Sequence, residues 1–400
     1  MNKEKVRKLS TLMSLYVAQS IPMSFFSTVV PVIMRQEQYS LQSIGLLQLI
    51  KLPWILKFLW APLVDNTSKN TKDYKRWIIY SEIFYAIVII CTGFLSLKTD
   101  FKLILFFMVL AFIGSATQDI ATDAFAILSL KKDERGIGNS IQSSGSFIGT
   151  LVGSGVMLII YHYFGWQYLL MALGVFVMLA TAPVCTYKKL EEKKPETTKV
   201  SMKDIKLFFT QKGIGKRVLV LSFFYSGIIG ILAMLKPFLV DLGYNVKEIG
   251  FMAGIYGTAA GAVSTFAASY LVKRKKIIGS AFILNIFMIT TAVYFLTLTY
   301  STPSTLALYV GITLLWSCYG MATVVVYTSS MNIVREGREG TDFTIQIVLT
   351  HLSSMIIAIA SGKIGHNFGY SGLFSFEIGM GVLSLIILTF STKKIKNKRR

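Results

Sequence analysis

Two aspartates spaced four residues apart are the best candidates for chemistry in this 400-residue sequence. Asp119 and Asp123 stand in the string ATQDIATDAF (116–125), inside an apolar run from Leu103 to Leu130. A spacing of i and i+4 puts both carboxylates on one face of a helix. The run is long enough to cross a bilayer, where one charged aspartate near the centre costs about 3 kcal/mol. The pair therefore predicts a proton or cation site that serves the movement of a solute.

The elements that must position this pair are membrane helices. The chain is 53% hydrophobic and 15% charged, whereas soluble domains carry about 25% charged residues. A window of about 19 residues finds twelve apolar runs, each too long for a barrel strand. We therefore expect an all-α membrane protein with twelve transmembrane helices. The runs fall at 11–34, 43–65, 77–97, 103–130, 137–161, 167–187, 218–240, 248–272, 277–297, 304–333, 341–365 and 370–392.

The net charge of +21 is distributed in a way that predicts orientation rather than a nucleic-acid partner. If the N-terminus is inside, the cytoplasmic segments hold 33 of the 41 Lys and Arg residues. The outside loops then hold only Arg35, Lys98, Lys102 and Lys247. This asymmetry follows the positive-inside rule. We expect both termini in the cytoplasm, membrane lipids around the chain and no nucleic-acid partner.

Patterns typical of enzymes and metal sites are missing from the sequence. Cys91, Cys185 and Cys318 all lie in apolar runs without metal-ligand spacing, and the three histidines are scattered. No G-x-x-x-x-G-K-[ST] string occurs, so the chain has no ATP-binding loop of that kind. We expect no enzyme activity, no metal and no cofactor, with a proton gradient as the energy source.

The chain divides into two related halves. A polar stretch at 188–217, with ten basic and four acidic residues, separates six apolar runs from six. HYFGW at 162–166 recurs as HNFGY at 366–370, and the pair Ile-Gln recurs at the same offset of 204. We therefore predict a parallel repeat.

The domains expected from this repeat are an N-terminal half at 1–187, a cytoplasmic linker at 188–217 and a C-terminal half at 218–400 with a basic tail. Within the linker, the spacing at 200–209 indicates a short helix on the membrane surface. A solvated linker is the alternative.

Three strings carry a family resemblance. They are SLYVAQSIPMSFF (14–26), SLQSIGLLQLIKLPWILKFLWAPLVD (40–65) and ATQDIATDAF. They resemble a branch of the major facilitator superfamily that contains muropeptide permeases of the AmpG type and siderophore permeases of the rhizobactin and pyochelin type. The resemblance is strong over about 1–165. It implies two six-helix halves that alternate access to a central site, in a monomeric, proton-driven importer of the bacterial inner membrane.

The same resemblance implies roles for particular residues. Asp119 and Asp123 are the expected proton or cation-coupling groups, with a gating role as the alternative for Asp123. Asp65, Lys75 and Arg76 fit the superfamily's gating signature after the second helix, although its usual glycines are absent. In the fifth span, glycines every four residues from Gly145 are expected to meet the eighth span, because small residues let helices approach closely.

Polar side chains in the spans are the expected contacts of the solute. Lys57 is a plausible partner for the aspartates, and extension towards the headgroups is its alternative. Lys51 and Lys236 favour an anionic substrate if they face the cavity. The full set of expected substrate-binding residues is Gln19, Lys51, Lys57, Gln118, Gln142, Lys236, Tyr327, Gln346 and His351.

Several functions compete at this point. The leading hypothesis is proton-coupled import of a bulky polar or anionic solute such as an iron-siderophore complex, because the compact length resembles the siderophore permeases. Import of muropeptides is the alternative. A drug or metabolite exporter of the same fold is a third, although such proteins usually carry a glycine-proline motif in a fifth helix that here has no proline. A membrane-embedded enzyme or sensor would need a nucleophile constellation or a metal site.

Overall fold

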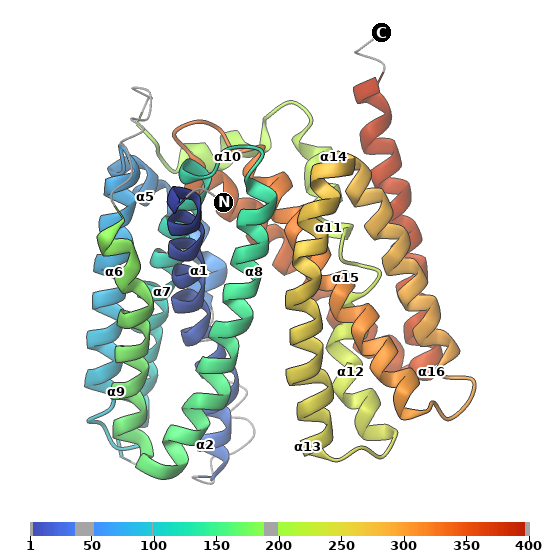
Figure 1. Cartoon of the computed structure of the whole chain (residues 1–400), viewed down its shortest axis with the longest axis horizontal. Coiled ribbons are helices and arrows are strands. Elements are labelled where there is room, and N and C mark those ends of the chain that lie inside the picture. The colour runs from blue at the N-terminus through green and yellow to red at the C-terminus, as the bar shows by residue number, and fades with distance from the viewer. Residues whose placement is uncertain (1–2, 37–51, 98, 188–198, 397–400) are drawn as a thin grey trace. The chain divides into compact units, whose positions relative to one another are not determined.

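The computed structural model describes residues 3–36, 52–97, 99–187 and 199–396, and within these ranges it contains helices and turns but no strand (Figure 1). By packing, the chain falls into two compact units. Unit 1 comprises Met1–Lys132, Ser144–Lys206 and Val334–Ile345. Unit 2 comprises Asp133–Ser143, Leu207–Ile333 and Gln346–Arg400.

The helices follow the apolar runs of the sequence. In unit 1 they are α1 (Lys3–Ser24), η1 (Phe25–Val29), α2 (Val30–Gln36), α4 (Leu52–Leu56), η3 (Lys57–Leu59), α5 (Ala61–Thr67), α6 (Thr71–Thr92), α7 (Phe101–Ser129), η4 (Val152–Val156), α9 (Met157–Thr186) and α10 (Lys203–Phe209). In unit 2 they are α11 (Ile214–Phe223), α12 (Ile229–Asp241), α13 (Val246–Ile249), η5 (Gly250–Tyr256), α14 (Gly257–Thr297) and α15 (Thr305–Met331). Three helices belong to both units: α8 (Arg135–Leu151), α16 (Glu339–Lys396) and α10, whose residues 207–209 are part of unit 2.

Three helical stretches are long enough for two membrane crossings each. They are Arg135–Thr186, Lys247–Thr297 and Glu339–Ser391, with 52, 51 and 53 residues, whereas one crossing needs about 20. Each contains one residue with positive φ, which breaks the helix between its two crossings. Together with single apolar helices at Lys3–Met34, Phe101–Ser129 and Thr305–Met331, these stretches supply nine of the predicted spans.

The other three predicted spans are interrupted or carry more charged residues. The second is represented by α4, η3 and α5, the third by α6, and the seventh by α11 and α12, which a turn at 224–228 separates. The order of helices agrees with the prediction, and the all-helical, twelve-span fold is confirmed.

The sequence repeat reappears as a repeated backbone turn. Gly165 has φ 76° and ψ −171°, and Gly369, which lies 204 residues later, has φ 67° and ψ −174°. This combination strongly favours glycine, because a Cβ atom would crowd the backbone. The shared Phe-Gly sequence therefore produces the same break between the two crossings of each of these helices. In the third long stretch the corresponding break is made by Lys276, with φ 58° and ψ 172°.

Glycines bring α8 against α1 inside unit 1. A Cβ atom built on Gly145 would lie 2.7 Å from the carbonyl oxygen of Met13, and one on Gly149 would lie 2.5 Å from that of Val17. Both distances are too short for any side chain, so these positions require glycine. The fifth span does meet the eighth, but through Ser140, whose hydroxyl donates to the carbonyl oxygen of Thr265 at 2.6 Å. Gly145 and Gly149 accommodate the first helix instead.

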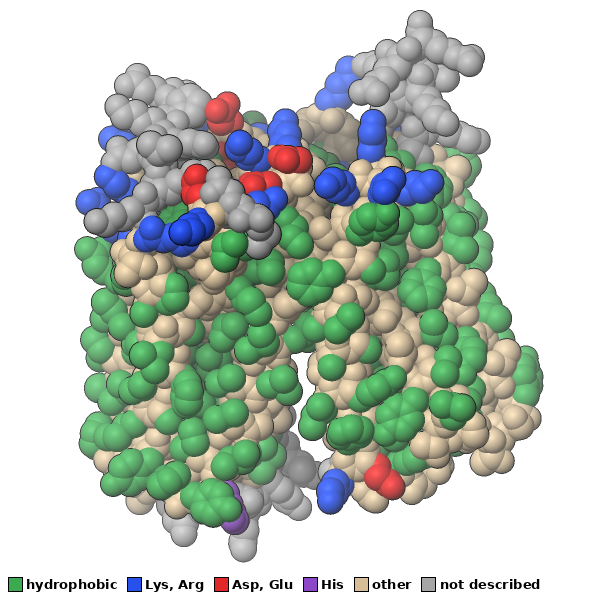
Figure 2. Space-filling view, in the orientation of Figure 1, with side chains coloured by type: hydrophobic (Ala, Val, Ile, Leu, Met, Phe, Trp, Pro, Cys, Tyr) green, Lys and Arg blue, Asp and Glu red, His purple; other side chains and the backbone are tan. Residues whose placement is uncertain are grey.

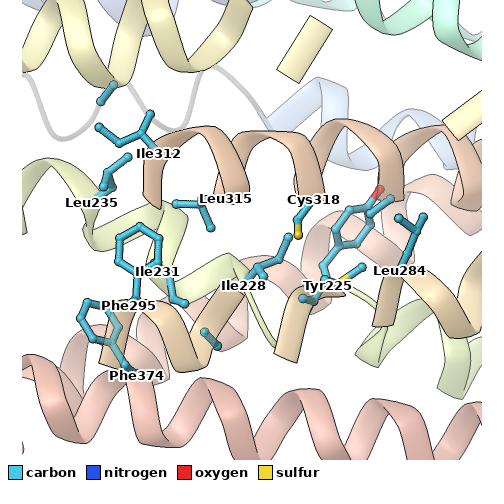
Figure 3. Close-up of a cluster of buried hydrophobic side chains, with 14 of the residues drawn as sticks. Tyr225, Ile228, Ile231, Leu235, Leu284, Phe295, Ile312, Leu315, Cys318 and Phe374 are labelled. Carbon is cyan, nitrogen blue, oxygen red and sulfur yellow. The ribbon is translucent and has the colours of Figure 1, made fainter. Parts of the chain in front are cut away.

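The interior of unit 2 is an apolar cluster formed around α15. Figure 3 shows side chains from the α11–α12 region, α14, α15 and α16 that converge on one another. Phe295 and Phe374 pack with ring centroids 5.5 Å apart. Those labelled are Tyr225, Ile228, Ile231, Leu235, Leu284, Phe295, Ile312, Leu315, Cys318 and Phe374.

The outer faces of both units are apolar as well. Figure 2 shows hydrophobic side chains along the flank of each unit, while most of the charged side chains that it colours lie near the helix ends. Leu179 is 63% exposed, Ile359 67% and Val263 72%. Water would disfavour so many exposed apolar side chains, and the hydrocarbon core of a bilayer accommodates them. The chain spans a membrane.

Candidate functional site

Lys57 lies at the turn that interrupts the second span. The helix α4 ends at Leu56, and a 3-10 turn (η3) follows before α5 begins at Ala61, with Pro62 in its first turn. Lys57 is only 1% exposed, so its side chain does not extend to a surface. Its Nζ atom forms an ion pair with Oδ2 of Asp119 and lies 4.2 Å from the ring centroid of Trp54. The predicted partnership of Lys57 with the aspartates is therefore present in the structure.

The two aspartates of α7 are buried and have different partners. Asp119 is 1% exposed and Asp123 3%. Whereas Asp119 pairs with Lys57 of η3, Oδ1 of Asp123 accepts a hydrogen bond of 3.1 Å from the hydroxyl of Tyr16 in α1. Buried charges are tolerated only when they are paired or hydrogen-bonded. One ammonium and two carboxylates leave one negative charge in this cluster, which a single proton would neutralise.

Polar groups next to the cluster extend it along α1 and α7. Trp60 Nε1 donates to Oγ1 of Thr117 at 3.1 Å, and Gln118 Nε2 approaches the carbonyl oxygen of Leu15 at 3.5 Å. The side-chain oxygens of Gln118 and Gln19 are buried and accept no hydrogen bond from any described residue. A buried acceptor without a donor costs about 1–3 kcal/mol. Both amides can therefore accept a bond from an N–H or O–H of a polar solute.

A second polar site of unit 1 is formed by Asp65 near the end of α5. Its carboxylate accepts hydrogen bonds from Gly340 N at 3.1 Å, Thr341 N at 2.7 Å and Thr341 Oγ1 at 2.6 Å. The hydroxyl of Tyr74 donates to it as well, at 2.5 Å. These backbone N–H groups belong to the first turn of α16, where a negative charge is stabilised by unpaired donors and the helix dipole. Asp65 thus acts as an N-terminal cap supplied by another helix.

A second aspartate holds the same stretch of chain from α10. The Asp204 carbonyl oxygen accepts from Arg335 Nη2 at 2.9 Å, and its carboxylate oxygen Oδ1 accepts from Arg338 Nε. Burial raises the pKa of Asp204, but the Ser201 N–H and the charges of Arg338 and Arg335 outweigh it and hold the pKa below its usual range. Residues 334–345 are therefore fixed to the rest of unit 1 by two carboxylates.

The sequence profile of the Major Facilitator Superfamily matches residues 12–345. The chain belongs to this family. A putative transporter AmpG 4 from Rickettsia conorii is 23% identical over 402 residues, with 97% of each chain covered. The anhydromuropeptide permease of Escherichia coli K12 is 24% identical over 396 residues, which cover 97% of this chain and 80% of that protein.

Solved structures support the fold. The outward-facing bacterial homologue of the iron transporter ferroportin superposes with a TM-score of 0.69 at 17% identity, over 98% of this chain and all of that one. The facilitator FucP in its outward conformation gives a TM-score of 0.72 at 13% identity, over 96% and 98% of the two chains. At these identities the likeness concerns the fold alone. As a member of the Major Facilitator Superfamily, this facilitator is a membrane-spanning transporter rather than an enzyme.

Five of the predicted solute contacts of this facilitator lie in unit 2. They are Gln142 of α8, Lys236 of α12, Tyr327 of α15, and Gln346 and His351 of α16. The two glutamines related by the repeat are buried, Tyr327 and His351 are half-buried, and Lys236 is exposed. Lys51 lies outside the described residues.

The two basic residues of the predicted gating signature make other contacts. Lys75 Nζ donates to the carbonyl oxygens of Cys185 at 2.8 Å and Tyr187 at 3.2 Å, at the end of α9. A cation is stabilised there by the negative end of the helix dipole. Arg76 is 69% exposed and pairs with Asp73 at 3.3 Å, one turn away. Exposed pairs of this kind contribute little to stability.

Sequence reasoning missed several residues of these sites. Trp54 and Trp60 lie three residues on either side of Lys57, and Tyr16 lies within the string that the first helix shares with its family. A lysine with an aromatic residue three positions before it and another three positions after it is a sequence pattern that predicts a cation–π contact. Asp204 and its arginine partners carried no such signal, because charged residues are common at the ends of membrane helices.

Proposed function

We propose that this facilitator is a proton-coupled importer of anhydromuropeptides in the bacterial inner membrane, with both termini in the cytoplasm. The substrate is inferred from the similarity, over 97% of this chain, to a protein named anhydromuropeptide permease. Two further relatives of similar length are named AmpG transporters. The iron-siderophore hypothesis rested on compact length, and these relatives favour the muropeptide alternative over it.

Coupling to protons is supported by the charge balance of the buried cluster. Lys57 neutralises one of the two carboxylates of α7, and Asp123 is held by a neutral tyrosine. If Asp119 takes up a proton, the ammonium of Lys57 loses its partner and becomes available to a carboxylate of the solute. Proton and anion would then enter together, because each removes the charge that the other leaves unbalanced.

Gating is assigned to residues 334–345. Before this segment can separate from α5 and α10, the bonds from Gly340 and Thr341 to Asp65 and those from Arg335 and Arg338 to Asp204 must break. These charge-assisted bonds are individually strong, and they are distributed over two separate helices. We therefore infer that Asp65 and Asp204 stabilise one state of the transport cycle.

The function is tested by uptake into proteoliposomes. Labelled anhydromuropeptide should accumulate when the outside is acidic, a protonophore should abolish the accumulation, and a ferric siderophore should not be taken up. Asp119→Asn should lose uphill accumulation while it retains exchange. Accumulation of the siderophore, or uptake of anhydromuropeptide that ignores the protonophore, would contradict the proposal. Uptake that occurs only when the inside of the proteoliposomes is acidic would favour an exporter.

The orientation is tested separately by labelling. In a variant without Cys91 and Cys185, which are exposed, a cysteine placed at Asn245 should react with an impermeant reagent from outside. A cysteine at Thr197 should react only after the membrane is opened. The reverse pattern would overturn the assignment of the termini to the cytoplasm, which rests on the distribution of Lys and Arg.

A further inference from the structure

Arg217 of α11 is a half-buried cation whose described partners are all neutral. Its Nε atom donates to Oε1 of Gln346 at 3.0 Å. Its Nη1 and Nη2 atoms donate to the hydroxyls of Ser329 at 2.8 Å and Ser330 at 2.7 Å. These partners come from the end of α15 and from α16, so the guanidinium is fixed by two helices besides its own.

No carboxylate pairs with this guanidinium in the part of the chain that the structure describes. Of its five N–H donors, three are used by the glutamine and the serines. Removing a cation from water without a counter-ion is costly. Its position adds to the cost, because Arg217 lies in the first turn of α11, close to the positive end of the helix dipole.

The repeat indicates that the fold does not require this arginine. At the offset of 204, the position of Arg217 corresponds to Met13, an apolar residue of α1. Its glutamine partner corresponds to Gln142, whose Oε1 atom is buried and accepts no hydrogen bond from any described residue. An arginine at only one of two equivalent positions, in an unfavourable electrostatic setting, points to a ligand rather than to packing.

We propose that Arg217 is an anion-binding residue that takes a carboxylate of the transported solute. The glutamine and the two serines fix the plane of the guanidinium, and two N–H donors remain for the carboxylate oxygens, in the paired geometry that arginine favours. The identity of the carboxylate rests on the proposed function. The anion site itself follows from the contacts of Arg217 and would hold for another anionic solute.

The test compares two solutes that differ in one charge. One is an anhydromuropeptide with a free terminal carboxylate, and the other is the same molecule amidated there. Arg217→Gln should raise the KM for the acid about ten- to one-hundred-fold, the range of a charge-assisted bond, and should leave that for the amide unchanged. Lys216→Gln is the matched control, because Lys216 is the exposed neighbouring cation of α11.

A structural role would give a different result. If Arg217→Gln impairs the acid and the amide equally, Arg217 only connects helices and the proposal is overturned. If that variant does not fold, Arg217→Lys keeps the positive charge but loses the planar guanidinium, and it should raise the KM for the acid by a smaller factor. Equal impairment of the acid and the amide in this variant would overturn the proposal as well. Ser330→Ala removes one connecting bond and should preserve the preference for the acid.

Two further experiments distinguish the anion site of Arg217 from a failure of the proposed function and from a lipid-binding site. Should the wild type transport neither solute, the proposed function fails, and Arg217 is then judged by thermal unfolding with citrate as the probe. Stabilisation of the wild type but not of Arg217→Gln supports the anion site, and equal responses overturn it.

Repeating the comparison of acid and amide in neutral and in anionic vesicles tests whether a lipid phosphate occupies the site. A preference for the acid that disappears in anionic vesicles would assign the site to a lipid headgroup.

Discussion

The helices α7 of unit 1 and α15 of unit 2 occupy equivalent places in the repeat but differ in charge. Asp119 and Asp123 correspond to Thr323 and Tyr327 at the offset of 204. In unit 1 the aspartates are buried with a lysine, whereas Thr323 Oγ1 of unit 2 accepts a hydrogen bond of 3.3 Å from the hydroxyl of Tyr225. The same helical frame therefore holds an ion pair in one unit and a neutral contact in the other.

A second pair of related segments repeats this difference. Residues 334–345 are held in unit 1 by the carboxylates of Asp65 and Asp204. The related stretch in unit 2 is held in part by neutral groups, since Ser140 donates to the carbonyl oxygen of Thr265 at 2.6 Å and Asn139 to Thr328 at 3.1 Å. In these related segments the carboxylates lie in unit 1, whereas unit 2 contributes the cation of Arg217. The buried carboxylate of Glu377 in unit 2 accepts hydrogen bonds from the Ser361 hydroxyl and the Gly230 N–H. We infer that the first unit handles the proton and the second an anion.

The largest effect is expected from breaking the buried pair of unit 1. Asp119→Asn leaves the ammonium of Lys57 without its carboxylate, and breaking a buried ion pair costs about 3–5 kcal/mol. Adding Lys57→Gln should restore much of the stability, because it removes the unpaired charge. Uphill uptake should stay absent in both variants, since an amide cannot carry a proton. Thermal unfolding and gradient-driven uptake, measured on the same preparations, check the two parts.

The comparison between the units supplies the control for this prediction. Thr323→Asp places a carboxylate at the equivalent position of α15, where no lysine corresponding to Lys57 is present among its described contacts. In the Asp119→Asn background it should not restore uptake. Recovery of uphill uptake would mean that either unit can carry the proton, and the division between the units would then be wrong.

Part of this division was predictable from the sequence. Ionisable residues inside apolar runs are rare and costly, so Asp119, Asp123 and Lys57 stood out without a structure. The repeat identified the neutral counterparts in α15. Residues at the ends of the apolar runs, such as Arg217 and Asp204, gave no comparable signal, because there a charge can simply face water. Only the structure shows that Arg217 is held by α15 and α16, and Asp204 by the loop between them.

Helix contacts were harder to predict than helix positions. The spacing of the glycines in the fifth span predicted a close approach of backbones, and the structure has one. The spacing could not identify the partner, because a small residue removes a steric barrier without selecting a surface. The same limit applies to Asp65, whose sequence context indicated gating but not its hydrogen bonds to the first turn of α16.

The next effect concerns the cap on α16. Asp65→Ala leaves the N–H groups of Gly340 and Thr341 without their acceptor, which should destabilise residues 334–345 by about 2 kcal/mol. Hydrogen exchange in this segment should quicken by roughly thirty-fold. Asn139→Ala in the related segment of unit 2 should change exchange at 334–345 little. If both variants quickened exchange at 334–345 equally, the proposed difference between a segment held by carboxylates and one held by neutral groups would be wrong.

The smallest effect is expected for Asp204, and it is tested by measuring hydrogen exchange at several pH values. Because the folded pKa of Asp204 lies below the ordinary value of about 3.9, its stabilising contribution is complete above that value and is lost only as pH falls through the lower folded pKa. Hydrogen-exchange protection of residues 334–345, corrected for the intrinsic pH dependence of exchange, should therefore stay constant from pH 7 to about pH 5.

Asp204→Asn removes the charge at every pH. With Arg335 and Arg338 only partly exposed, at 23% and 15% of their side chains, the loss should be about 1 kcal/mol, or roughly five-fold faster exchange. The difference between variant and wild type should be the same at pH 7 and pH 5, and Ser140→Ala should leave this segment unaffected. A difference that disappears between pH 6 and pH 5 would show that Asp204 is protonated there. The contact between α10 and residues 334–345 would then titrate between pH 6 and pH 5, and residues 334–345 would be a pH-sensitive segment of unit 1 rather than a fixed one.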